Sequence, residues 1–337
     1  MKTFFTTALT VASLSGMFGG SLQAAPPATA KIRIALIVES TVDDKGWCQS
    51  MHDAILAVQK KRGAANVEYS HSEKMKPVDA GSAARQYASK GFDIIICHGA
   101  QYYNLVTEIY SIFPNTTFAY GTSANIGPKN VFTYTPYSEE TGYLNGIIAG
   151  MVTKANKIGN VGPVDGGDSA RYTRGFMLGV AKANPKAQVR VAFTGSFGDF
   201  VKAGELAQTQ LKDGADVLTG SAQQAIGALR AVAAAPAGIY WLGQDLAQLG
   251  IPEGTRVVAA SSYNYAAVVE AMITKRAAGV KGGESLPLQF SNGGFHFEFN
   301  PKMDAKVLTP AIKKAVEKAK ADLTSGKLVL DWKAVKL

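Results

Sequence analysis

Histidine and cysteine are scarce in this chain of 337 residues, which has four histidines and two cysteines. None of them has the spacing of a zinc site. The sequence also lacks a Gly-x-Ser-x-Gly elbow, an HExxH motif and a P-loop. We therefore predict a protein that is not an enzyme and that has no metal or cofactor. Cys48 and Cys97 follow neighbouring predicted elements, so one disulfide and two buried free thiols both remain open.

Long apolar runs are also missing, since no segment beyond the N-terminus approaches 18 apolar residues. Residues 1–25 combine Lys2, the apolar run "FFTTALTVASLSGMF" and the small residues of "SLQAA". This pattern predicts a cleavable signal peptide and hence a periplasmic protein. The net charge is +9, but the basic residues are scattered singly. We therefore expect no nucleic-acid partner.

Apolar strand-like runs alternate with helical segments along the rest of the chain. Such alternation is typical of a doubly wound parallel sheet with helices on both faces, and here the pattern occurs twice. We predict an α/β protein of two such lobes that are interleaved in sequence. The predicted ranges are 32–136 plus 262–285 for lobe 1, 137–261 plus 286–325 for lobe 2, and 326–337 for a C-terminal tail. In the last part of the chain, from Lys314 on, we expect a helix and a short strand.

Ligands of open parallel sheets bind beyond the carboxyl ends of the strands. Trp47 lies there in lobe 1, at the start of a helix, and Phe197 has the equivalent position in lobe 2. Two rings from facing lobes would clamp a planar heterocycle. The alternative for Trp47 is a ring packed on its own helix.

Polar residues follow the same strand ends. Asp44 and Asp245 would accept hydrogen bonds from ring N–H groups, amines or hydroxyls, although Asp44 could instead cap a helix and Asp245 could be a turn residue. Three further candidates are Gly220, Ser221 and Asn264. His98 and Gln101 are weaker candidates, and a histidine at a strand end is more often satisfied within the protein.

The segment "VDDKGWCQSMHDAI" resembles the "DDKSFNQS" motif of the basic membrane protein family, the substrate-binding proteins of ABC importers. The match includes Asp43, Asp44, Lys45, Gln49 and Ser50. Gln49 therefore joins the candidate ligand-binding residues. A second segment, "SEETGYLNGIIAGMVTKANKIGNVG", is similar to the family's "YLAGVVAGKMTKSNKIGYI", and "GADVLTGSAQQA" and "YWLGQD" fit its later strands. The resemblance covers most of residues 32–300. It implies the type I periplasmic-binding-protein fold, which closes like a Venus flytrap.

The resemblance also implies a ligand and a partner. Family members bind purine nucleosides, purine bases or flat heterocycles such as riboflavin, and they deliver them to an inner-membrane permease. Family ligand positions match Asp44, Trp47, Phe197, Gly220 and Asp245. Nucleoside binders have a lysine near Tyr263, whereas "YNY", residues 263–265, resembles the Trp-Asn-Trp of purine-base binders.

Our hypothesis is a monomeric binding protein for a free or oxidised purine base, delivered to an ABC permease. Cys48, which replaces the family's Asn, weakens the assignment to a nucleoside. A sensory module for a membrane receptor is the first alternative. A nucleoside hydrolase is a weaker one, because the sequence offers no acid–base or metal constellation.

Overall fold

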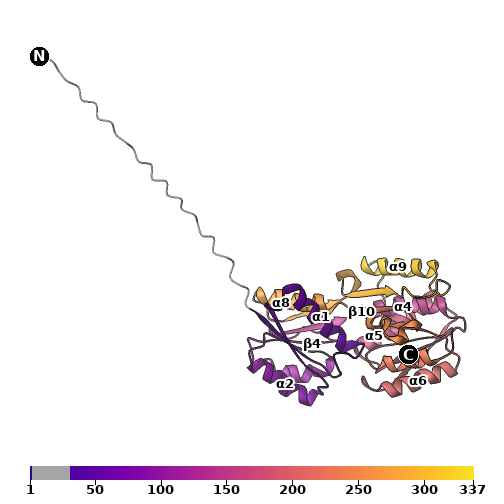
Figure 1. Ribbon diagram of the computed structural model, residues 1–337, viewed down its shortest axis with the longest axis horizontal. Helices are drawn as coiled ribbons and strands as arrows, with labels where there is room; N and C mark the ends of the chain where they lie inside the picture. The colour runs from indigo at the N-terminus through magenta and orange to yellow at the C-terminus, as the bar shows by residue number, and fades with distance from the viewer. Residues whose placement is uncertain (2–30) are drawn as a thin grey trace. The chain divides into compact units, whose positions relative to one another are not determined.

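The computed structural model describes Met1 and residues 31–337. The predicted signal peptide therefore lies, apart from Met1, outside the described residues. Residues 31–337 contain two six-stranded sheets with helices between their strands (Figure 1). This confirms the predicted α/β class and its two parallel-sheet lobes. Among the described residues, no helix combines the length and the apolar character that a membrane crossing needs.

The first sheet is parallel throughout and has the strand order β11-β5-β4-β3-β1-β2. Its strands are β1 (Ile32–Ile37), β2 (Val67–Ser72), β3 (Ile94–Cys97), β4 (Thr117–Gly121), β5 (Val131–Pro136) and β11 (Glu284–Leu288). The central strand β3, "IIIC", is fully buried, as expected of a parallel strand covered on both faces. One face packs against α1 (Trp47–Arg62) and α8 (Tyr265–Ala277), and the other against α2 (Pro77–Ser89) and α3 (Tyr103–Ile109).

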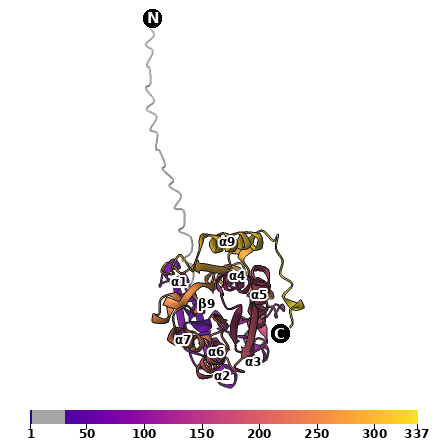
Figure 2. The same ribbon diagram turned by 90° about the vertical axis from the view of Figure 1, so that its right-hand side faces the viewer.

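The second sheet has the order β12-β10-β9-β8-β6-β7 and is parallel except for the edge strand β12, which runs antiparallel to β10. Its strands are β6 (Lys157–Gly162), β7 (Gln188–Phe193), β8 (Val217–Gly220), β9 (Tyr240–Gly243), β10 (Val257–Tyr263) and β12 (Phe295–Phe299). Residues of α6 (Phe200–Lys212) and α7 (Ala225–Ala234) cover one face. The other face carries α4 (Glu139–Val152), α5 (Gly167–Ala183) and α9 (Pro310–Thr324). Figure 2 shows α9 directly beside α4.

The chain passes between the two sheets three times. It leaves the first sheet between β5 and α4, returns between β10 and α8, and leaves again between β11 and β12. Backbone hydrogen bonds join two of these passages, because Tyr137 donates its N–H to the carbonyl of Leu288 at 2.9 Å. The predicted lobe ranges remain a prediction, and their boundary at residue 285 falls inside β11.

Three features differ from the expectations or decide between alternatives. Apolar runs in the sequence predict five strands in each half, and the edge strands β11 and β12 raise the number to six among the described residues. The predicted strand near the C-terminus is wrong, because residues 328–331 are irregular and Trp332–Ala334 form a 3₁₀ helix. This tail lies along α5 instead of beside a sheet, with the Val335 carbonyl accepting from Arg174 Nε at 3.1 Å. Cys48 and Cys97 are free and buried.

Candidate ligand-binding site

Loops at the carboxyl ends of the strands of both sheets enclose a cavity of about 230 Å³, here called the inner cavity. Lobe 1 contributes the loops after β1, β3 and β4, and lobe 2 those after β6, β7 and β8. The lining residues are Glu39, Trp47, Cys48, His98, Gly99, Ala100, Gln101, Thr122, Val164, Gly166, Gly167, Asp168, Phe197, Ala222 and Gln223. The inner cavity therefore lies where open parallel sheets bind their ligands.

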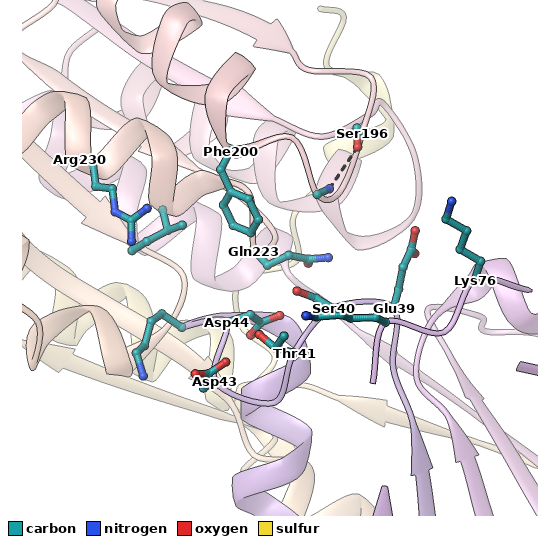
Figure 3. Close-up of a pocket in the computed structure, with 14 residues that line it drawn as sticks. Glu39, Ser40, Thr41, Asp43, Asp44, Lys76, Ser196, Phe200, Gln223 and Arg230 are labelled. Carbon is teal, nitrogen blue, oxygen red and sulfur yellow. Dashed lines mark hydrogen bonds between the residues drawn. The ribbon is translucent and has the colours of Figure 1, made fainter. Parts of the chain in front are cut away.

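A second and more polar space of about 570 Å³, the outer cavity, adjoins the first (Figure 3). The two share Glu39 and Gln223. The outer cavity is lined by Glu39, Ser40, Thr41, Asp43, Asp44, Lys45, Lys74, Lys76, Ser196, Gly198, Phe200, Gln223, Ile226 and Arg230. Figure 3 shows Gln223 projecting between Phe200 of one lobe and the Glu39–Thr41 loop of the other.

Trp47 and Phe197 line the same inner cavity from opposite lobes. Trp47 is the first residue of α1, and its indole Nε1 donates to the His98 carbonyl at 3.2 Å. Its ring stacks on the His98 imidazole, with centroids 4.4 Å apart and planes 12° apart. Edge contacts to Tyr263 and Tyr265, at 5.3 and 5.7 Å, fix it further. The indole is thus held rigidly by its surroundings, whereas Phe197 is about one-third exposed.

His98 is a supporting residue whose two ring nitrogens are both engaged. Nε2 lies 3.0 Å from the Trp47 carbonyl and Nδ1 lies 2.6 Å from the Tyr134 hydroxyl. Because a carbonyl only accepts, Nε2 donates its proton and Nδ1 accepts from Tyr134. Burial lowers the pKa of His98 to about 3, so the ring is neutral at physiological pH. These bonds agree with the expectation that a histidine at a strand end is satisfied within the protein. The His98 ring also borders the inner cavity.

Asp44 satisfies backbone N–H groups at the start of α1, two residues before the N-cap Gly46. Its oxygens accept from the backbone N–H groups of Gly46, Cys48 and Gln49 at 3.0 to 3.3 Å. Burial raises the pKa of Asp44, and these hydrogen bonds oppose that shift. Asp44 also borders the outer cavity, so the residue that holds the start of α1 lies at the wall of the cleft, and its role in binding a ligand stays a prediction.

The two glutamines of the predicted site make hydrogen bonds within lobe 1. Gln49 accepts from the Lys45 N–H at 3.0 Å, and it borders neither the inner nor the outer cavity. Gln101 lines the inner cavity, and its Nε2 donates to Glu39 at 2.8 Å. Gln101 thereby orients an acidic side chain at the cavity wall.

Asp168 and Gln223 belong to the site but were not singled out from the sequence. Asp168, in the first turn of α5, accepts from the Tyr263 hydroxyl at 2.9 Å, and burial raises its pKa to about 6. Gln223 is 5% exposed, and its Oε1 has no hydrogen-bond partner. A buried amide oxygen without a donor is costly in free energy. Both residues lie in loops that the ends of the predicted strands had identified.

Gly46 brings the two lobes into backbone contact beside the inner cavity. A Cβ atom on Gly46 would lie 3.0 Å from Cα and 3.3 Å from Cβ of Gln223. Gly46 belongs to the lobe 1 loop before α1, and Gln223 to the lobe 2 loop after β8. The lack of a side chain at position 46 therefore sets how closely these two loops approach.

Besides Gln49, five predicted residues lie outside the inner and outer cavities. Asp245, Tyr263 and Asn264 border a third cavity of about 480 Å³ beside α1 and α8. One oxygen of Asp245 caps the following 3₁₀ helix through the Ala247 N–H at 2.8 Å, and Oδ2 is buried without a partner. Gly220 packs against β6 at a place where a Cβ would lie 2.6 Å from the Val161 carbonyl oxygen. Ser221 is buried, with its hydroxyl 2.8 Å from that of Ser169.

Left-handed backbone is concentrated in the same cleft. Among the described residues, five residues other than glycine have a positive φ, and four of them border the cavities: Lys45 and Lys74 the outer one, Thr122 and Ala222 the inner one. This conformation is unfavourable for residues with a Cβ and occurs preferentially at binding sites. The backbone conformation and the residues that line the cavities are separate observations, and both point to the same cleft.

Comparisons of this chain with family models and with known proteins point to the same family. A family model described as an ABC transporter substrate-binding protein, PnrA-like, matches residues 31–325. The chain is 23% identical to an ABC transporter nucleoside-binding protein of Lactococcus lactis, over 90% of either chain. It is 24% identical to a purine-binding protein of Brucella abortus, over 63% of this chain and 59% of that protein.

Some relatives match over a shorter part. The CD4+ T-cell-stimulating antigen of Listeria innocua is 27% identical over 55% of this chain, which spans about half of that protein, 53%. Two solved structures support the fold. The solute-binding protein of an ABC transporter from Conexibacter woesei has a TM-score of 0.71 and 22% identity, over 89% of this chain and 98% of its own. A corresponding protein from Aeropyrum pernix has a TM-score of 0.76 and 19% identity, over 88% and 92%.

Proposed function

Because the chain belongs to the family of PnrA-like ABC transporter substrate-binding proteins, we propose that it captures a purine-type ligand between its lobes and delivers it to a membrane permease. Within this class we favour a free or oxidised purine base over a nucleoside. The protein would act in the periplasm as a monomer.

One observation supports a flat ligand above all others. Trp47 and Phe197, one from each lobe, line the same small cavity. Stacking of an aromatic ring on a planar heterocycle contributes about 0.5–1.5 kcal/mol of binding free energy, in addition to the effect of the buried area. The rigid packing of Trp47 against His98, Tyr263 and Tyr265 means that little side-chain entropy is lost when a ligand stacks on it.

The size of the inner cavity favours a base over a nucleoside. Its volume of about 230 Å³ lies below the range of about 300–1,000 Å³ that is usual for larger ligands. A ribosyl group would have to extend into the outer cavity, past Glu39 and Gln223. Relatives are named both for nucleoside binding and for purine binding, so our preference for a base is supported by the size of the cavity alone.

Closure of the lobes provides the mechanism. Contacts from both lobes form fully only when the loops approach, so a ligand that touches both lobes shifts an open–closed balance towards the closed state. Tyr263, at the end of β10 and next to a passage between the sheets, contributes to this contact. Its ring packs edge-on against Trp47 of lobe 1 with centroids 5.3 Å apart, and its hydroxyl donates to Asp168 of lobe 2. The closed lobes would then present one surface to the permease.

The test first identifies the ligand and then asks whether Trp47 binds it. Mass spectrometry of freshly purified protein should release a purine, and purine bases should raise the melting temperature above the effect of nucleosides and flavins. Trp47→Ala should weaken binding by about 10-fold or more, while Trp47→Phe keeps most of it.

Trp332→Phe is the matched control, because Trp332 lies in the C-terminal tail away from the cavity. It should bind as the wild type does. Absence of any stabilisation across bases, nucleosides and flavins would exclude the proposal. Stabilisation by riboflavin alone would replace the purine by another flat heterocycle, and conversion of an added nucleoside would point to a hydrolase.

A further inference from the structure

We infer that the inner cavity selects a neutral purine rich in N–H donors, an aminopurine, over an oxidised purine that carries negative charge. This inference narrows the proposed function and rests on it. Glu39, Asp168 and Gln223 line the inner cavity with hydrogen-bond acceptors, and the lining residues include no lysine or arginine.

The acceptors come from both lobes. Glu39 follows β1 and is oriented by Gln101. Asp168 follows β6, and its Oδ2 is bonded to the Tyr263 hydroxyl. The buried Oε1 of Gln223 has no partner. Ionised carboxylates accept and never donate, so a ligand satisfies Glu39 and Asp168 only by offering N–H or O–H groups.

Few donors face the same space. His98 directs its one N–H at the Trp47 carbonyl, and Trp47 directs its own at the His98 carbonyl. Thr122, the second N–H of Gln101 and the amide nitrogen of Gln223 remain among the side chains of the lining. A ligand with many carbonyl oxygens would therefore leave several of them unpaired in the closed cavity.

Charge gives the same preference. The cations of the cleft, Lys45, Lys74, Lys76 and Arg230, border the outer cavity and not the inner one. The N-terminus of α5 does face the inner cavity, and a helix N-terminus attracts anions. Asp168 already supplies a carboxylate in that first turn, so a second anion would face like charges.

The Gln223 amide alone does not discriminate, because it pairs equally well with a lactam edge and with an amino–imino edge. The two carboxylates therefore decide the preference. This makes Asp168 and Glu39 the residues to change, with substitutions that keep shape and remove charge.

Calorimetric titration of the full chain with adenine, guanine, xanthine and urate tests the inference. In the wild type, the aminopurines should bind at least about 10-fold more tightly than the anionic oxidised purines. Asp168→Asn and Glu39→Gln should each lower this ratio by about 10-fold, partly by improving the binding of urate. Glu39 is exposed, so its variant reports on recognition even if Asp168→Asn folds poorly.

Asp165→Asn is the matched control. Asp165 lies in the same loop but pairs with Arg174, with Oδ2 3.0 Å from Nη2, and it does not line the inner cavity. The ratio of aminopurine affinity to oxidised-purine affinity in Asp165→Asn should equal that of the wild type. Tighter binding of urate or xanthine by the wild type, or an unchanged ratio in both variants, would overturn the inference while leaving purine binding intact. Failure of all four purines to bind would overturn the proposed function as well.

Discussion

At the scale of single residues, the absence of a side chain at Gly46 controls the distance between two lobes. A methyl group there would lie 3.0 Å from Gln223 Cα, which is backbone that does not rotate away. We predict that Gly46→Ala keeps the stability of the ligand-free protein and weakens ligand binding by about 10-fold, because the loops no longer meet. Calorimetry and thermal unfolding with and without ligand measure the two effects.

Gly198 provides the control for this change. It borders the outer cavity, and a Cβ atom on it would meet nothing within 4 Å. Gly198→Ala should bind ligand as the wild type does. Equal losses in both variants would show that loop flexibility, and not the Gly46–Gln223 contact, matters for binding.

The sequence predicted the loops of the site better than the side chains within them. Trp47 and Phe197 were found because an aromatic ring after a strand end is conspicuous, and both line the inner cavity. Asp168 and Gln223 were not chosen, because their loops hold several polar residues and only the packed structure determines which one faces inward. Asp245 and Asn264 follow strand ends too, yet they border a different cavity beside α1 and α8.

At the scale of elements, α4 and α5 cross with their backbones in contact. Gly142 and Gly146 on α4 face Tyr172 and Phe176 on α5, and a Cβ atom on either glycine would collide with the facing carbonyl oxygen. Gly175 and Gly179 on α5 have the reciprocal positions. Small residues four apart allow such close approach of two helices. The first turn of α5 carries Asp168, so this contact also positions the site.

We predict that Gly146→Ala or Gly179→Ala lowers the free energy of unfolding by about 1–3 kcal/mol or more through overpacking. Urea unfolding measures it. Gly204→Ala is the control, since Gly204 is also helical but its Cβ would lie 3.4 Å from the nearest atom, the Gly227 carbonyl oxygen. That variant should be as stable as the wild type, or more so by up to about 1 kcal/mol. A comparable loss at Gly204 would contradict the packing argument.

The elements themselves could largely be predicted from periodicity. Residues 47–62 are predicted to be helical from the sequence, and α1 has these bounds. The buried parallel strands were evident as apolar runs. The edge strands β11 and β12 were missed, because β11 contains Pro287 and β12 is buried on only one face. The C-terminal segment near Leu330 reads as a strand locally, but a contact distant in sequence, with α5, determines its conformation.

At the scale of the whole molecule, buried acids make the stability depend on pH. Burial raises the pKa values of Asp168 to about 6 and of Asp245 and Glu140 to about 7. Unfolded carboxyls release their protons near pH 4. Between these values the folded protein holds protons that the unfolded chain has lost, so the free energy of unfolding falls as the pH rises from about 4 to 7. His98, with its lowered pKa, opposes this trend below about pH 6.5.

We predict that Asp245→Asn flattens this dependence, because an amide cannot ionise. The difference in unfolding free energy between pH 8 and pH 5 should be more favourable in the variant than in the wild type, by roughly 3 kcal/mol at most. Urea unfolding at the two pH values measures the change, with Glu317→Gln, at an exposed position, as the control. A wild type whose stability rises from pH 5 to 8 would contradict the predicted sign.

The three passages of the chain between the sheets bear on how the protein could be divided. A single backbone cleavage at one passage would leave the halves joined by the other two. Neither lobe corresponds to a continuous gene segment, so neither can be obtained by simple truncation. Each sheet receives its last strand, β11 or β12, only after most of the other sheet has been synthesised. Neither lobe can therefore finish folding before the last part of the chain has left the ribosome.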